Sequence, residues 1–322
     1  MRSACLLSVI ATLLSSSISF AQGADYPNRP IELILPAAAG GTTDTAVRML
    51  ADKWRETLGQ PIVVVNKPGA GGAIGASAVA KAAPDGYTLL GAFDSITVAL
   101  PIVNKVDYSF DSFTYLNGFG VGTVFFAVRA DSPWKNIKDF VEAARAAEKA
   151  GKPFTYASYG FGVITHFTAE RLWQQTGVKL QYVTYRSSPE SAVALLGGHV
   201  DLAVTAGTGG VATNPDIRII GVAAKTRRPD LASVPTLLEQ GYDVSLDYIS
   251  GVLAPAGLPE PVKQKLLKAI ANTNTKYGEE LKRDMLKADL LYADISGDQM
   301  RATWEEREKW FREVAPRLEL KR

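Results

Sequence analysis

The stretch that decides the fold is IELILPAAAGGTTDTAVRML, residues 31–50. Its first five residues form a short apolar run typical of a buried strand, and Pro36 ends that run. A glycine-rich turn over 37–44 then leads into a helix. One face of that helix carries large apolar residues at the spacing of a buried stripe, namely Val47, Leu50, Trp54 and Leu58. A strand, a glycine-rich turn and an amphipathic helix in this order predict one unit of an α/β fold.

The same order recurs along the chain. A second strand over 62–65 precedes the turn Asn66–Gly72, a helix reaching about Ala82 and a strand over 87–90. The remaining expected strands are 121–128, 154–158, 180–185, 200–204 and 217–224, and the expected helices are 137–150, 163–175, 189–196, 259–275, 278–288 and 297–314. Continuous apolar strands that alternate with helices indicate a parallel sheet covered on both faces. We therefore expect an α/β protein, and its length suggests two domains.

The first residues predict export. Arg2 precedes an apolar run from Leu6 to Leu14, which is too short to span a membrane, and Ser19-Phe20-Ala21 fits a cleavage site. We interpret residues 1–21 as a signal peptide that is cleaved near Ala21, and we expect a periplasmic protein. The chain's one cysteine, Cys5, lies in this peptide, so the mature chain is expected to have neither a disulfide nor a cysteine nucleophile.

Composition and motifs argue against several classes of function. The chain has 35 basic and 33 acidic residues without a block of like charge, so no nucleic-acid partner is expected. Gly69-x-Gly71 is a weak nucleotide motif, because the third glycine, Gly75, comes one residue late. The sequence has no HExxH or GxSxG, and its only histidines are His166 and His199. We expect neither a metal, a cofactor nor catalysis, and nothing demands more than a monomer.

The glycine-rich turns indicate an anion-binding site. Each follows a buried strand and opens a helix, so its free N–H groups face outward at the positive end of the helix dipole. Turns at 158–162 and 186–189 offer the same arrangement in the second half of the chain. Four such turns can converge on one cleft. The alternative is that they are only tight turns and helix caps, that His166 is structural and that Arg186 is a solvated surface residue.

A resemblance to a known family rests on motifs along the whole mature chain. They are Pro36-x3-Gly40-Gly41-x2-Asp44, Leu58-Gly59-Gln60-Pro61, Asn66-Lys67-Pro68-Gly69-Ala70-Gly71-Gly72, Ile74-Gly75, Ala83-Pro84-Asp85-Gly86-Tyr87-Thr88-Leu89-Leu90, Tyr156-Ala157-Ser158 with Gly160-x-Gly162, Leu195-Leu196-Gly197-Gly198 with Val200-Asp201-Leu202, Val234-Pro235-Thr236 and Leu253-Ala254-Pro255-Ala256-Gly257. With these motifs the chain resembles the Bug family, the extracytoplasmic solute receptors of tripartite tricarboxylate transporters.

The resemblance implies a periplasmic-binding-protein fold of type II, with two α/β domains, a ligand cleft between them and two interdomain crossings. Domain 1 would comprise 22–125 plus 251–322, and domain 2 would comprise 126–250. The implied function is capture of a small organic carboxylate for a two-subunit membrane permease, although such a permease is not always present. The candidate ligand-binding residues are Ala37, Ala38, Ala39, Gly40, Gly41, Thr42, Thr43, Asn66, Gly69, Ala70, Gly71, Ser95, Ser158, Tyr159, Phe161, Gly162, His166, Arg186, Ser187 and Thr205.

Departures from the family pattern bear on specificity. Ala37 and Ala39 replace an aromatic residue and a proline, whereas Tyr159 and Phe161 replace small residues. Added aromatic surface favours a ring or a long apolar body, so we expect an aromatic or extended carboxylate, such as an extended dicarboxylate. Two alternatives remain: a ligand sensor that serves a signalling partner, and a secreted hydrolase or lyase.

Overall fold

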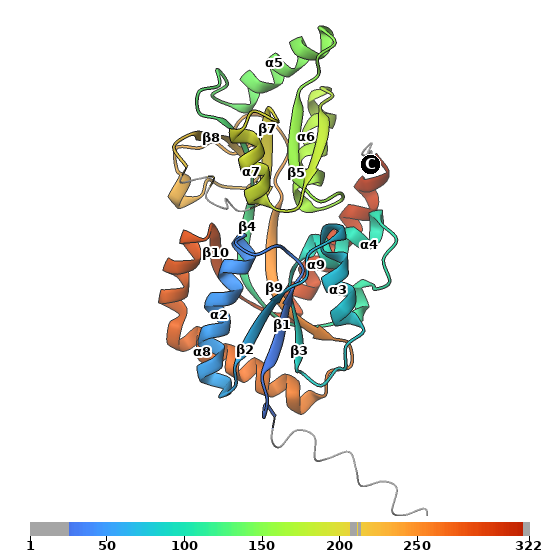
Figure 1. Cartoon of the computed structure of the whole chain (residues 1–322), viewed down its shortest axis with the longest axis vertical. Coiled ribbons are helices and arrows are strands. Elements are labelled where there is room, and N and C mark those ends of the chain that lie inside the picture. The colour runs from blue at the N-terminus through green and yellow to red at the C-terminus, as the bar shows by residue number, and fades with distance from the viewer. Residues whose placement is uncertain (1–25, 207–210, 212–213, 318–322) are drawn as a thin grey trace, which may run out of the picture.

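The structure is a computed structural model of the chain and describes residues 26–206, 211 and 214–317. The predicted signal peptide, residues 1–21, and its cleavage point near Ala21 lie outside the described residues. Figure 1 shows two lobes, one above the other, with strands β4 (Phe113–Arg129) and β9 (Asp247–Pro255) running between them.

The strands are ordered β2-β1-β3-β9-β4-β7-β5-β6, and β8 and β10 each pair with β4. The other strands are β1 (Ile31–Leu35), β2 (Ile62–Asn66), β3 (Thr88–Phe93), β5 (Thr155–Tyr159), β6 (Gln181–Tyr185), β7 (Leu202–Ala206), β8 (Ile217–Val222) and β10 (Leu290–Ser296). Pairing is parallel among β1, β2 and β3, and again among β5, β6 and β7. Pairing with β4 and β9 is antiparallel. The sheet therefore contains two parallel parts joined by antiparallel strands.

Strand β4 belongs to both parts. Residues 113–123 pair with β9, and residues 124–129 pair with β7 and β8. We call the part with β1–β3 the first lobe and the part with β5–β8 the second lobe. The predicted domain boundaries near 125 and 250 stay predictions, because β4 and β9 continue through them as unbroken strands.

Helices cover the sheet in each lobe. In Figure 1, α2, α3, α8 and α9 surround the first lobe, and α5, α6 and α7 surround the second. Their bounds are α2 (Thr42–Leu58), α3 (Ala73–Ala80), α4 (Leu100–Val103), α5 (Ile137–Lys149), α6 (Ile164–Thr176), α7 (Ser188–Leu196), α8 (Glu260–Lys287) and α9 (Gly297–Val314). None of the helices within the described ranges is both long and apolar enough to cross a membrane.

Helix α2 forms as its sequence predicts. Val47, Leu50 and Trp54 are buried against the sheet, and Leu58 is half-buried. Gly59 ends the helix in the left-handed conformation, in which its N–H donates to the carbonyl of Arg55. The first helix therefore runs from the glycine-rich turn at one end of β1 to the second strand.

In the C-terminal part, one expectation is wrong and two strands were missed. The helices predicted at 259–275 and 278–288 are one helix, α8, and the strands β9 and β10 were not predicted. Contacts with α2 flank Gly278 on both sides and keep α8 continuous: Thr57 meets Thr273, and Lys53 pairs with Glu280. Such contacts outweigh the cost of about 1 kcal/mol of a glycine inside a helix.

Candidate ligand-binding site

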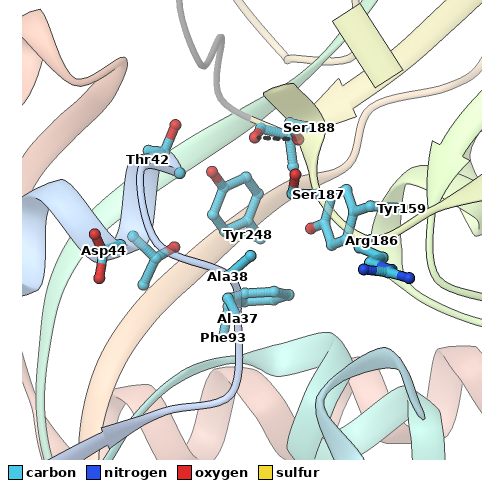
Figure 2. Close-up of a pocket in the computed structure, with 13 residues that line it drawn as sticks. Ala37, Ala38, Thr42, Asp44, Phe93, Tyr159, Arg186, Ser187, Ser188 and Tyr248 are labelled. Carbon is cyan, nitrogen blue, oxygen red and sulfur yellow. Dashed lines mark hydrogen bonds between the residues drawn. The ribbon is translucent and has the colours of Figure 1, made fainter. Parts of the chain in front are cut away.

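A cavity lies between the two lobes, where loops from both lobes meet (Figure 2). Its volume is about 50 Å³. The wall is formed by Ala37, Ala38, Gly41, Thr42, Thr43, Asp44, Phe93, Tyr159, Arg186, Ser187, Ser188, Ala206 and Tyr248. The space that water-sized molecules can occupy in this cavity corresponds to a few waters.

The start of α2 leaves backbone donors free in this wall. The N-cap Gly41 has extended backbone, and no side chain caps the helix. The first N–H to be satisfied within the helix is that of Thr45, which donates to Gly41 O. Within the described part of the chain, the N–H groups of Gly41, Thr42 and Thr43 have no acceptor. These donors and the helix dipole attract a negative group.

Asp44 holds the first glycine-rich loop in place. Its carboxylate accepts from the Gly40 N–H at 3.0 Å and from the Arg48 guanidinium at 3.1 Å. The Asn66 amide donates to the same carboxylate at 2.9 Å and to Ala37 O at 3.0 Å. Burial raises the pKa of the Asp44 carboxyl, but these hydrogen bonds outweigh burial and lower the pKa below its usual value. The side chain of Asn66 therefore braces the loop and is absent from the cavity wall.

The second glycine-rich loop makes one of the contacts between the lobes. A Cβ atom on Gly160 of the second lobe would lie 3.2 Å from the Cα of Gly71 in the first lobe. Gly71 also approaches Val163 and Leu100. The Gly69–Gly71 segment is therefore part of the lobe-to-lobe contact, and none of its residues is in the cavity wall.

The end of β5 contributes one residue to the cavity wall, Tyr159, and the loop that follows contributes none. Behind it, the Gly162 N–H donates to Nδ1 of His166 at 3.0 Å. The His166 ring stacks on the Tyr182 ring, with 4.3 Å between the ring centroids, and its centroid lies 5.0 Å from that of Phe161. Burial lowers the pKa of His166 to about 4, so the imidazole is neutral near pH 7. His166 therefore packs behind the cavity wall, where it accepts a hydrogen bond from the loop and supports its conformation.

The start of α7 faces the cavity from the second lobe. Ser187 caps the helix by accepting from the Glu190 N–H, and Ser188 Oγ donates to Ala206 O at 3.3 Å. Arg186 is exposed and lines the cavity (Figure 2). Within the described ranges, the Arg186 guanidinium has no carboxylate partner. It is therefore available to an anion in the cavity.

Three aromatic rings line one side of the cavity. Phe93 contacts Tyr159 at 6.3 Å and Tyr248 at 5.6 Å between ring centroids. Sequence reasoning missed Phe93 and Tyr248. The predicted strand ended at residue 90, three residues before Phe93, and β9, which carries Tyr248, was not predicted. The sequence offered one signal for Phe93. It follows the predicted buried strand 87–90, and ligands of parallel sheets bind beyond the carboxyl ends of the strands.

The predicted site residues thus divide into two groups. Those in the cavity wall are Ala37, Ala38, Gly41, Thr42, Thr43, Tyr159, Arg186 and Ser187. Those outside the wall are Ala39, Gly40, Asn66, Gly69, Ala70, Gly71, Ser95, Ser158, Phe161, Gly162, His166 and Thr205. Ser95 and Thr205 are fully buried, and their hydroxyls have no hydrogen-bond partner in the described part of the chain. Across residues 26–206, 211 and 214–317, no cluster of His, Cys, Asp or Glu is arranged to hold a metal ion.

Comparison with known proteins gives the same architecture. The family described as the tripartite tricarboxylate transporter family receptor matches residues 46–313. The periplasmic binding protein BugD has a TM-score of 0.83 and 28% identity over 92% of this chain and 99% of its own. MatC from Rhodopseudomonas palustris, with bound malate, has a TM-score of 0.82 and 26% identity over 90% and 99% of the chains. Rpa4515 of R. palustris, with adipate, has a TM-score of 0.84 and 25% identity over 91% and 98%. These matches confirm the periplasmic-binding-protein fold.

Proposed function

Because the chain belongs to the family of tripartite tricarboxylate transporter receptors, whose members are periplasmic solute-binding receptors and not enzymes, we propose that it captures a dicarboxylate with an extended apolar or aromatic body. The receptor then delivers this acid to a two-subunit membrane permease. We also propose that the chain is exported to the periplasm and that its signal peptide is cleaved near Ala21. Membership of a receptor family excludes the hydrolase or lyase alternative.

One observation carries the proposal: two helix starts, one from each lobe, face the same cavity. Gly41, Thr42 and Thr43 of the first lobe offer free N–H groups, and Arg186 beside the start of α7 offers a free guanidinium. Each helix dipole stabilises an anion by about 0.3–1 kcal/mol, and a hydrogen bond to a charged group adds about 1.5–3 kcal/mol. Positive potential at both ends of one cavity favours a ligand with a negative group at both ends.

The aromatic side of the cavity supports an apolar body between those groups. Phe93, Tyr159 and Tyr248 offer ring faces and edges, and Ala37, Ala38 and Ala206 add small apolar groups. Such a wall favours a methylene chain or an aromatic ring over a body studded with hydroxyls or amines. The malate and adipate bound by the two R. palustris relatives are both dicarboxylates, which supports a ligand with two negative groups for this chain.

The small cavity volume supports a receptor that opens and closes. The contact between Gly71 and Gly160 closes the second loop against the second lobe, and β4 and β9 connect the lobes. Separation about these strands would admit the ligand, and closure would then remove water and strengthen the electrostatic contacts. A hinge-closing receptor is therefore consistent with both the cavity and the interlobe contact.

A thermal-shift screen of matched acids tests the proposal. The mature protein is heated with straight-chain diacids of four to eight carbons, with aromatic diacids and with the monoacids of equal length. At 100 times the Kd, a bound ligand adds about 2.7 kcal/mol to the unfolding free energy. We expect diacids with an apolar body to raise Tm more than monoacids do. Stabilisation by amino acids or monoacids alone would contradict the proposed ligand class.

Uptake of the identified acid tests the delivery step. Deletion of the gene for this chain is expected to abolish uptake of the radiolabelled acid at low external concentration. Restoring the gene should recover the uptake. Unchanged uptake, with loss of a transcriptional response to the acid, would instead indicate the sensor alternative.

A further inference from the structure

Two buried residues of the cavity wall, Tyr248 of β9 and Thr42 at the start of α2, carry hydroxyl groups that have no hydrogen-bond partner among the described residues. The Tyr248 side chain is 2% exposed and Thr42 is 7% exposed, and both residues line the cavity. The Tyr248 hydroxyl, on a residue that lines the cavity, makes no hydrogen bond to any described residue, and the buried Thr42 hydroxyl also lacks a partner there. In Figure 2 the Tyr248 hydroxyl points to the side of the cavity where Thr42 lies.

The direction of the Tyr248 hydroxyl is fixed by packing. The ring lies over Gly122 of β4, where a Cβ atom would come within 1.9 Å of Cζ. Phe93 contacts the same ring at 5.6 Å between centroids. A side chain held by a facing glycine and a neighbouring ring has little freedom to rotate toward another acceptor.

Other buried tyrosines of this protein satisfy their hydroxyls internally. Tyr108 donates to Ile96 O at 2.8 Å, and Tyr115 donates to Phe110 O at 3.1 Å. A buried hydroxyl without a partner costs free energy, so such a group usually meets a water or a ligand. Among the described buried tyrosines, Tyr248 departs from this pattern, and it is also the one that lines the cavity.

The neighbouring donors indicate which ligand atom the hydroxyl meets. The free N–H groups of Gly41, Thr42 and Thr43 lie in the same wall, and an N–H group can only donate. A carboxylate offers about four lone-pair sites and no donor, so it can accept from both backbone and hydroxyl groups. Burial keeps the pKa of the Tyr248 phenol above its usual value, so the hydroxyl retains its proton near pH 7.

We propose that the Tyr248 hydroxyl is a specificity-determining donor that, with the Thr42 hydroxyl, completes the subsite for the ligand carboxylate at the start of α2. This inference rests on the proposed function and adds a residue from the interlobe strand β9 to the binding site. A subsite of this kind selects a carboxylate over its primary amide, because the amide NH₂ would face donors.

The test is titration calorimetry of the mature wild-type protein and the Tyr248→Phe variant with adipate. The variant removes one oxygen and keeps the ring over Gly122. We expect the Kd for adipate to rise about 10-fold, and the unfolding midpoint of the ligand-free protein to stay the same or rise. Thr42→Val is expected to raise the Kd in the same direction.

Tyr115→Phe is the matched control, because its hydroxyl is satisfied by Phe110 O outside the cavity. That variant should lose stability and keep the wild-type Kd. A wild-type Kd in Tyr248→Phe would overturn the inference. So would a weaker affinity in this variant if the ligand-free protein lost as much unfolding free energy as binding free energy. Wild-type protein that binds no diacid of four to eight carbons would overturn the proposed function as well, so the two failures can be distinguished.

Discussion

The Cα atom of Gly71 lies 3.2 Å from the position that a Cβ atom on Gly160 would occupy. The two glycines belong to different lobes, and both have positive φ, +67° and +73°. A Cβ on Gly160 would be unusually tight against this backbone, and the positive φ of both residues also favours glycine. This part of the interlobe contact is therefore formed by two glycines that lie in turns the sequence suggested for ligand contact.

Replacing Gly160 with alanine should impair closure. The positive φ costs about 1–2 kcal/mol of stability, and the added Cβ would press on Gly71 and Val163. Gly177→Ala is the control, because Gly177 has φ +68° and no atom within 4 Å of its Cβ position. Both variants should lose stability in urea unfolding because of the positive φ, and Gly160→Ala should lose more because of the added contact. Only Gly160→Ala should raise the ligand Kd, by about 10-fold, and equal Kd values for the two variants would show that closure does not use this contact.

Arg186→Gln should separate diacids from monoacids. We expect the Kd for a diacid to rise about 10-fold and the Kd for the matching monoacid to stay within about 2-fold, because one carboxylate loses a charged partner. Raising the salt concentration should shrink the difference between wild type and variant. Arg312→Gln, which removes an exposed arginine of α9 paired with Glu308, is the control. If the Kd for the monoacid rises as much as the Kd for the diacid, Arg186 either contacts the carboxylate at the start of α2 or acts only through the general electrostatic potential of the cavity.

Asn66→Ala should destabilise the first glycine-rich loop. The variant loses the hydrogen bonds to Ala37 O and Asp44 and leaves the carbonyl of the half-buried Ala37 without this donor, so we expect a loss of about 1–3 kcal/mol in unfolding free energy. Asn274→Ala in α8 is the control, with an expected change within about 0.5 kcal/mol. A stable variant with reduced affinity would instead indicate that Asn66 contacts the ligand directly.

His166 should make the protein sensitive to acid. Its pKa is about 4 in the folded protein, whereas an unfolded histidine titrates near 6.5. Between these values the unfolded state binds a proton that the folded state does not, so stability falls as pH falls. His166→Gln keeps an acceptor for the Gly162 N–H and cannot titrate. From pH 7 to pH 5 the wild type should lose about 2 kcal/mol more than this variant in urea unfolding. Parallel losses would contradict the buried neutral imidazole.

Local patterns predicted the units that begin with β1 and β2. The apolar run 31–35, the Val47, Leu50 and Trp54 face and the stop at Gly59 all correspond to the structure, because each depends on neighbours in sequence. The glycine-rich turn 37–43 could likewise be recognised as a helix start with free donors.

Features that depend on distant partners could not be predicted in this way. The continuity of α8 through Gly278 comes from contacts with α2, more than 200 residues earlier in the chain. Tyr248 faces the cavity because β9 pairs with β4 and Gly122 leaves room for its ring. Asn66 has the position expected of a ligand contact, but its amide is used by Asp44 and Ala37, and only the three-dimensional structure reveals that competition.

The most direct test of the account is the amide ¹⁵N–¹H spectrum of the mature protein during titration with adipate. The central claim is that unpaired N–H groups at the start of α2 receive the carboxylate. We expect the amide protons of Gly41, Thr42 and Thr43 to move downfield on saturation, as donors to a charged acceptor do, while that of Gly59, already bonded to Arg55 O, stays in place. Saturation of the protein without movement of these three signals would contradict the claim.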